Sequence, residues 1–104
     1  MRKLSVNSVY HEDEGTLRIA VRGRFDFSML AEFREAYSRI EAEPQKVIID
    51  MRHTETIDSS ALGMLLNMQR HLNKGDREIR IINCNEDVRN VFDITRFDRK
   101  FDIS

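Results

Sequence analysis

The first part of the chain alternates between apolar and polar positions, which is the pattern of strands with one buried face. Leu4, Val6 and Val9 give a short alternating segment, and residues 17–21 alternate again after the polar run 12–15. That run ends in glycine and is typical of a turn. The pattern therefore predicts a β-hairpin at the start of the chain.

Two later segments space their apolar residues three or four positions apart, which places them on one face of a helix. Ser28 is a candidate cap for the first helix, whose apolar residues are Leu30, Phe33, Tyr37 and Ile40. The second helix follows Asp58, is expected to stop at Gly75, and is built on Ala61, Leu62, Leu65, Leu66 and Leu72.

Two short β-branched runs, 47–49 and 79–82, are typical of buried strands. A short helix is predicted over 87–93, and the tail is expected to pack through Phe97, Phe101 and Ile103. Strands and helices alternate after the hairpin. The predicted fold class is therefore α/β, with a mixed sheet of four to five strands that starts with the hairpin and has helices packed mainly on one face.

Composition narrows the possible functions. The 104 residues suffice for one domain, 1–104, and the net charge of −1, with acidic and basic residues interspersed, argues against a nucleic-acid partner. Cys84 is the single cysteine, so no internal disulfide or thiolate zinc site can form. No apolar run approaches the ~20 residues of a membrane span. We expect a cytoplasmic monomer that does not enter a membrane.

The segment Asp58-Ser59-Ser60 carries the main candidate chemistry because it opens the second helix. Asp58 is suited to accept a hydrogen bond from a free amide of the first turn, so the simplest interpretation is a helix cap. A helix N-terminus also tolerates a phosphate, which makes the serine hydroxyls candidate modification sites. The pattern alone leaves both interpretations open.

The outer face of this helix is a candidate partner-binding surface. A rotation of about 100° per residue turns Leu62, Leu65 and Leu66 toward the core. The same rotation places Met64, Asn67 and His71 outside, with Met68 at the margin. Flexible methionines suit adaptable binding surfaces, although two methionines are equally compatible with packing at the edge of the core.

The motifs together resemble a known family. The run Val47-Ile48-Ile49-Asp50 and the run Ile57-Asp58-Ser59-Ser60-Ala61-Leu62-Gly63 are similar to the signature of the STAS domain family, the anti-sigma factor antagonists. Gly23-Arg24-Phe25-Asp26 resembles the family's turn after its second strand, and residues 88–93 resemble its last helix. The resemblance covers nearly the whole chain and implies a single STAS domain.

The resemblance implies that Ser59 is phosphorylated by a partner that is both an anti-sigma factor and a serine kinase, and that the unphosphorylated form binds this partner. ATP and Mg²⁺ would belong to the kinase, and a cognate phosphatase would reset the switch. Asp58 and Asp26 would support the site. The sequence departs from the family pattern at Ala61, Thr54 and Thr56, and Ser60 and Thr56 are alternative phosphate acceptors.

Three other hypotheses remain at this point. An enzyme would need a base near a nucleophile and a third group to orient it; His53 has no such partner in the sequence, so we expect no enzyme. A receiver-like domain would carry its phosphate on Asp50, which ends a β-branched run. A constitutive STAS scaffold would keep Ser59 as a cap that no kinase modifies.

Overall fold

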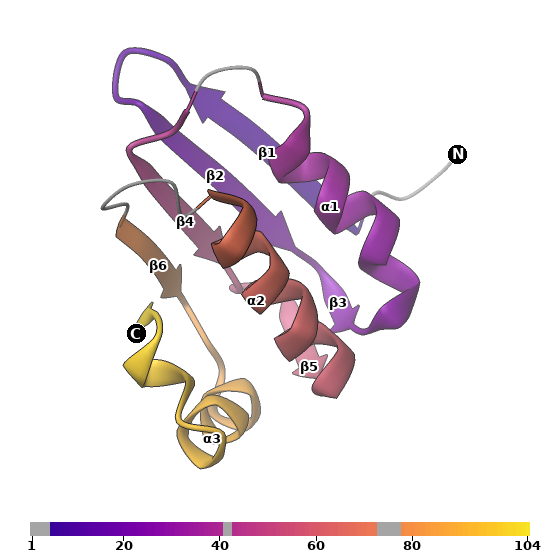
Figure 1. Cartoon of the computed structure of the whole chain (residues 1–104). Helices are drawn as coiled ribbons and strands as arrows, with labels where there is room; N and C mark the ends of the chain where they lie inside the picture. Colours follow the sequence, from indigo (N-terminus) through magenta and orange to yellow (C-terminus); the bar gives the residue numbers. More distant parts are fainter. Residues whose placement is uncertain (1–4, 41–42, 73–77) are drawn as a thin grey trace.

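The computed structural model describes residues 5–40, 43–72 and 78–104, and its centre is a five-stranded sheet (Figure 1). The strand order is β1-β2-β4-β6-β7. The bounds are Val6–His11 for β1, Thr16–Val21 for β2, Lys46–Asp50 for β4, Glu78–Ile82 for β6 and Asp102–Ile103 for β7. β1 and β2 form an antiparallel hairpin, and the remaining pairs are parallel. The predicted mixed sheet beginning with a hairpin is confirmed.

Two helices lie side by side across one face of this sheet, α1 (Leu30–Ser38) and α2 (Ser59–Leu72). A third helix, α3 (Glu86–Ile94), follows β6 beyond its carboxyl end (Figure 1). Strand residues that point toward α1 and α2 are almost fully buried, including Ile19, Ile49 and Ile81. These three residues are register partners on β2, β4 and β6, so they form one row across the sheet at the base of the core.

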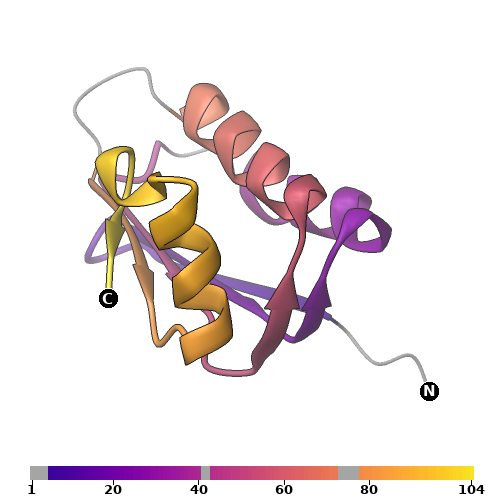
Figure 2. The same cartoon turned by 90° about the horizontal axis from the view of Figure 1, so that it is seen from below.

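A second, two-stranded sheet was not predicted. It pairs β3 (Gly23–Phe25) with β5 (Thr54–Ile57) in parallel, with Phe25 opposite Ile57. In Figure 2 the two strands rise together from the main sheet to the helix layer, where α1 and α2 begin. Segments of three or four residues with mixed polarity carry little periodic signal, so local pattern does not predict this pair.

The orientation predicted for α2 is wrong by part of a turn. Met64 and Met68 are buried, at 4% and 0% exposure, while Leu62 and Leu66 are only half-buried at the margin of the core. The buried face follows the four-three-four spacing of Ala61, Leu65, Met68 and Leu72. Unbranched methionine side chains fill irregular core space well, so the helix turns this stripe inward. Neither methionine is available as an exposed contact.

Other expectations hold with small changes. The predicted short helix and the apolar contacts of the tail are confirmed, and the rings of Phe92, Phe97 and Phe101 stack in series at 5.6 and 5.5 Å between centroids. Asp26 rather than Ser28 caps the turn before α1. Val9 is 48% exposed, because it lies on the opposite face of β1 from Val6.

Two expected positions, Leu4 and Gly75, lie outside the described residues. Among the helices that the structure describes, none has the length and apolar character to cross a bilayer.

Candidate functional site

The start of α2 is built as a capped helix end. The Oδ1 atom of Asp58 accepts a hydrogen bond from the Ala61 amide at 3.1 Å, and the Asp58 carbonyl accepts from the same amide. This confirms the capping role predicted for Asp58. Ser59 is the first residue of the helix and is exposed, so its hydroxyl lies beside free amide groups and the positive end of the helix dipole.

The other candidate hydroxyls differ from Ser59 in exposure. Thr54 is 2% exposed, and its hydroxyl donates a 2.8 Å hydrogen bond to the carbonyl of Val21. Ser60 is half-buried in the first turn of α2, and Thr56 is exposed on β5, opposite Arg24 of β3. Thr54 is therefore a structural residue, and the exposed hydroxyls near the helix start belong to Ser59 and Thr56.

Asp26 lies at the same end of the molecule as Asp58. Phe25 and Ile57 are register partners, so the aspartates that follow them leave neighbouring parallel strands together. The Asp26 carboxylate accepts hydrogen bonds from the hydroxyl and the amide of Ser28, the latter at 3.0 Å. These two bonds lower the pKa of Asp26. The carboxylate therefore stays charged at this edge while it holds the turn into α1.

Asn85 is a supporting residue that sequence analysis missed. Its Oδ1 atom caps α3 by accepting from the Val88 amide at 2.8 Å. Its Nδ2 group donates to the carbonyls of Thr54 and Glu55 at 3.0 and 3.1 Å. The side chain thus joins the start of α3 to β5, the strand that leads to Ser59. An Asn directly before the acidic pair at 86–87 was the available capping signal.

The exposed side of α2 forms a narrow stripe. Ser59, Gly63 and Asn67 follow each other at four-residue intervals, all exposed, and we call these three residues the α2 stripe. His71 continues it into the last turn, where its ring contacts Tyr37 with 5.2 Å between centroids. Of the residues predicted to bind a partner, Asn67 and His71 are exposed, whereas Met64 and Met68 are in the core.

Phe27 is a large exposed apolar residue in the segment that follows β3. Phe27 is 68% exposed and stands two residues after Phe25, just as Ser59 stands two residues after Ile57. Because Phe25 and Ile57 are paired in parallel, the chain segments that carry Phe27 and Ser59 both leave the small sheet at its carboxyl end. Exposed aromatic side chains are enriched among the residues that dominate protein–protein binding, which makes Phe27 a candidate contact.

The receiver-like hypothesis does not fit the fold. Receivers have a doubly wound parallel sheet with the order 2-1-3-4-5, whereas this sheet begins with an antiparallel hairpin at its edge. Asp50 points to the face of the sheet away from α2, where Arg18 donates to its Oδ2 atom at 3.0 Å. The receiver-like domain, the alternative in which Asp50 would carry the phosphate, therefore has a different topology from this chain.

Sequence comparison identifies relatives over nearly the whole chain. The STAS domain model matches residues 7–104. A STAS-domain containing protein of Pseudomonas aeruginosa is 36% identical over 101 residues, which cover 97% of this chain and 100% of that protein. An anti-sigma-B factor antagonist of Staphylococcus epidermidis is 25% identical over 93 residues, covering 88% of this chain and 84% of that one.

Solved structures agree with this assignment. An anti-sigma factor antagonist from Mycobacterium paratuberculosis superposes with a TM-score of 0.74 at 17% identity, over 95% of this chain and 85% of that chain. The anti-sigma factor antagonist SpoIIAA in its unphosphorylated form gives 0.62 at 20% identity, over 84% and 90% of the two chains. These likenesses establish the shared fold, and together with the match over residues 7–104 they show that the chain belongs to the STAS domain family.

Proposed function

We propose that this chain is a protein-binding switch in which the form with unmodified Ser59 binds an anti-sigma factor with serine kinase activity, and phosphorylation of Ser59 releases it. The observation that carries the proposal is the exposed Ser59 hydroxyl in the first turn of a helix capped by Asp58. The domain itself is regulatory and not catalytic. ATP and Mg²⁺ belong to the partner kinase, and a phosphatase returns the domain to its binding form.

The helix start can accept a phosphate without a change of fold. Free amides and the helix dipole favour an anion there, so phosphorylation leaves α2 intact. The modification adds about −1.5 to −2 charges at pH 7 beside the exposed carboxylates of Asp58 and Glu55. A partner that covers this surface must then desolvate the added charge. About 2.7 kcal/mol of lost binding energy lowers affinity a hundredfold.

The surface beside Ser59 suits a partner that approaches closely. Gly63 carries no side chain, and a Cβ atom built there would have no neighbour within 4 Å, so a partner backbone has room above this turn. Phe27, which is exposed just after β3, offers an apolar anchor at the end of the small sheet where α2 begins. Aromatic anchors surrounded by polar contacts commonly dominate binding energy. Asn67 and His71 extend the proposed surface toward the end of α2.

Known proteins support the proposal through their named roles. The Staphylococcus epidermidis relative is an anti-sigma-B factor antagonist, and the SpoIIAA structure is that of an anti-sigma factor antagonist in its unphosphorylated form. These names fit a domain whose candidate phosphate acceptor, Ser59, is exposed at a helix end. The cellular process that this protein controls would depend on which partner it binds.

The decisive experiment isolates the protein from its host with and without phosphatase treatment and maps phosphate by mass spectrometry. We expect phosphate on Ser59, none in the Ser59→Ala variant, and unchanged modification in Thr56→Val. Phosphate found only on Thr56 or Ser60 would move the site. No phosphate under any growth condition would favour the constitutive scaffold.

Binding measurements with the proposed partner kinase complete the test. Ser59→Ala should bind as tightly as the unmodified wild type, and Ser59→Asp should bind more weakly, although one carboxylate only partly reproduces a phosphate. Asn90→Asp is the matched control, because it adds one negative charge at an exposed position on α3. Equal affinity of Ser59→Asp and wild type would contradict the switch mechanism.

A further inference from the structure

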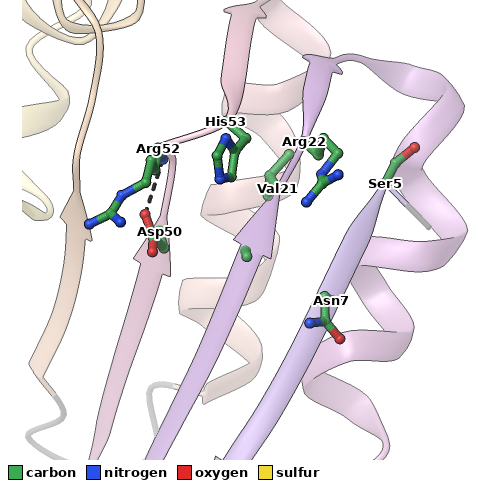
Figure 3. Close-up of a pocket in the computed structure, with 8 residues that line it drawn as sticks. Ser5, Asn7, Val21, Arg22, Asp50, Arg52 and His53 are labelled. Atoms are coloured by element: carbon green, nitrogen blue, oxygen red, sulfur yellow. Dashed lines mark hydrogen bonds between the residues drawn. The ribbon is translucent and has the colours of Figure 1, made fainter. Parts of the chain in front are cut away.

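The face of the main sheet that is not covered by α1 and α2 contains an open hollow of about 420 Å³ (Figure 3). Its floor follows one row of the sheet, because Asn7, Ala20 and Asp50 are register partners on β1, β2 and β4. Ala20 has the shortest side chain of the three, and its methyl group leaves the space open. The volume lies in the range of small-molecule sites, about 300–1,000 Å³.

Hydrogen-bond donors surround this floor. Arg22 and His53 lie at the same end of the hollow, at the carboxyl ends of β2 and β4, and Asn7 lies on β1 (Figure 3). Arg22 and His53 are exposed, and within residues 5–40, 43–72 and 78–104 neither forms an ion pair. The guanidinium group of Arg52 points away from the hollow, past Asp50.

Among the described residues that line the hollow, Asp50 carries the one carboxylate, and its charge is balanced. Oδ2 of Asp50 accepts from Arg18 at 3.0 Å, and Oδ1 accepts from the Arg52 amide and from Asn83, each at 3.0 Å. The Arg18 charge therefore offsets that of Asp50, and Arg22 leaves the hollow with a positive balance. A guanidinium fork binds phosphate through two parallel hydrogen bonds, and an amide and an imidazole N–H can serve further phosphate oxygens.

From this geometry we infer that the hollow binds a small molecule through a phosphate group, held by Arg22, His53 and Asn7 above the methyl group of Ala20. The site lies on the side of the sheet opposite the α2 stripe and does not depend on the switch proposed for Ser59. The hollow is larger than a phosphate alone requires, so the ligand carries a further organic part that extends toward Ser5.

NMR titration tests this site with the whole chain. Inorganic phosphate, added at constant ionic strength against chloride, should shift the amide signals of residues 5, 7, 20–22 and 50–53 along a saturable curve. Glycerol 3-phosphate should shift the same signals at equal or lower concentration, and glycerol should leave them unchanged. Shifts that stay linear and spread over the surface, or equal shifts with glycerol, would overturn the inference.

Three variants make the test specific. Arg22→Gln should weaken phosphate binding about tenfold, as expected for the loss of a charge-assisted hydrogen bond. Arg99→Gln is the matched control, since Arg99 is exposed in the turn before β7 and should change nothing. Ala20→Leu should abolish binding by filling the hollow. If this variant does not fold, the comparison of Arg22→Gln with Arg99→Gln still tests the site. Equal affinities for those two variants would contradict the proposed site.

Discussion

The Thr54 hydroxyl donates a buried 2.8 Å hydrogen bond to the carbonyl oxygen of Val21, and this contact joins β5 to the end of β2. A second contact works from the other side, because Asn85 donates to the Thr54 and Glu55 carbonyls. The strand that leads to Ser59 is therefore fixed to the main sheet and to α3. A site held in this way presents its hydroxyl from a rigid support.

Thr54→Val should lower the free energy of unfolding by about 1–2 kcal/mol, because it keeps the shape of the side chain and removes one buried hydrogen bond. Urea denaturation followed by circular dichroism measures the change. Thr56→Val, on the exposed side of the same strand, is the control and should stay within about 0.5 kcal/mol of wild type. Equal stability of the two variants would show that the Thr54 contact does not hold β5.

Gly63→Ala should separate stability from binding. Glycine inside a helix is less favourable than alanine by up to about 1 kcal/mol, and a Cβ atom here would meet nothing within 4 Å, so the variant should be more stable. Affinity for the partner kinase, measured by calorimetry, should fall because the methyl group lies one turn from Ser59 on the α2 stripe.

The control for this variant is Asn90→Ala, which improves helix propensity at an exposed position on α3 and leaves the α2 stripe unchanged. It should bind the partner as wild type does. If Gly63→Ala also retained full affinity, the bare turn after Ser59 would lie outside the interface.

Adjacent residues of α2 should have opposite effects. Met68→Ala should cost about 2–4 kcal/mol of stability, since Met68 is 0% exposed and truncation leaves a cavity. Asn67→Ala should leave stability nearly unchanged and weaken partner binding, because Asn67 is exposed on the α2 stripe. Thermal unfolding and calorimetric titration of both variants distinguish the two roles. If Asn67→Ala lost stability and Met68→Ala did not, the orientation of α2 described above would be contradicted.

Asp50 should make folding stability depend on pH. Burial alone would raise the pKa of Asp50, but hydrogen bonds from Asn83, the Arg52 amide and Arg18 outweigh it, and the pKa is lowered. A carboxyl group with a lower pKa in the folded state adds stability above about pH 4, and this contribution is lost as the pH falls through the folded pKa. Asp50→Asn should therefore be about 1–2 kcal/mol less stable at pH 7.

The difference between wild type and Asp50→Asn should shrink below pH 4 in urea denaturation series. Asp102→Asn serves as the control, because Asp102 is exposed and its 3.2 Å ion pair with Arg80 is a surface contact worth less than about 0.5 kcal/mol. A difference for Asp50→Asn that stays constant down to pH 3 would show that its charge does not contribute.

Local patterns predicted most of the fold. The hairpin, the helices and the Asp58 cap follow from periodicity and capping, which act over a few residues. The β3–β5 pair depends on Phe25 meeting Ile57, 32 positions apart in the chain, and no local pattern encodes that contact. β7 was missed because a strand of two residues has no measurable alternation.

The site was predicted in part for a similar reason. Asp58 and Ser59 were located through their place at a helix start, whereas the burial of Met64 and Met68 depends on how α2 settles against its neighbours. The spacing of Ala61, Leu65, Met68 and Leu72 carried the correct orientation, but the more hydrophobic Leu62 and Leu66 outweighed it. Asn85 donates hydrogen bonds to β5, which is about 30 positions away in the chain, and no local pattern predicts that contact.

Consecutive residues of β4 face opposite compartments, since Ile49 enters the core beneath the helices and Asp50 borders the hollow behind the sheet. One layer of backbone thus separates the two surfaces. The partner proposed for α2 and the phosphate ligand proposed for the hollow would therefore contact opposite faces of the sheet, and both could be bound at the same time. If both proposals hold, one small domain would respond to two signals independently.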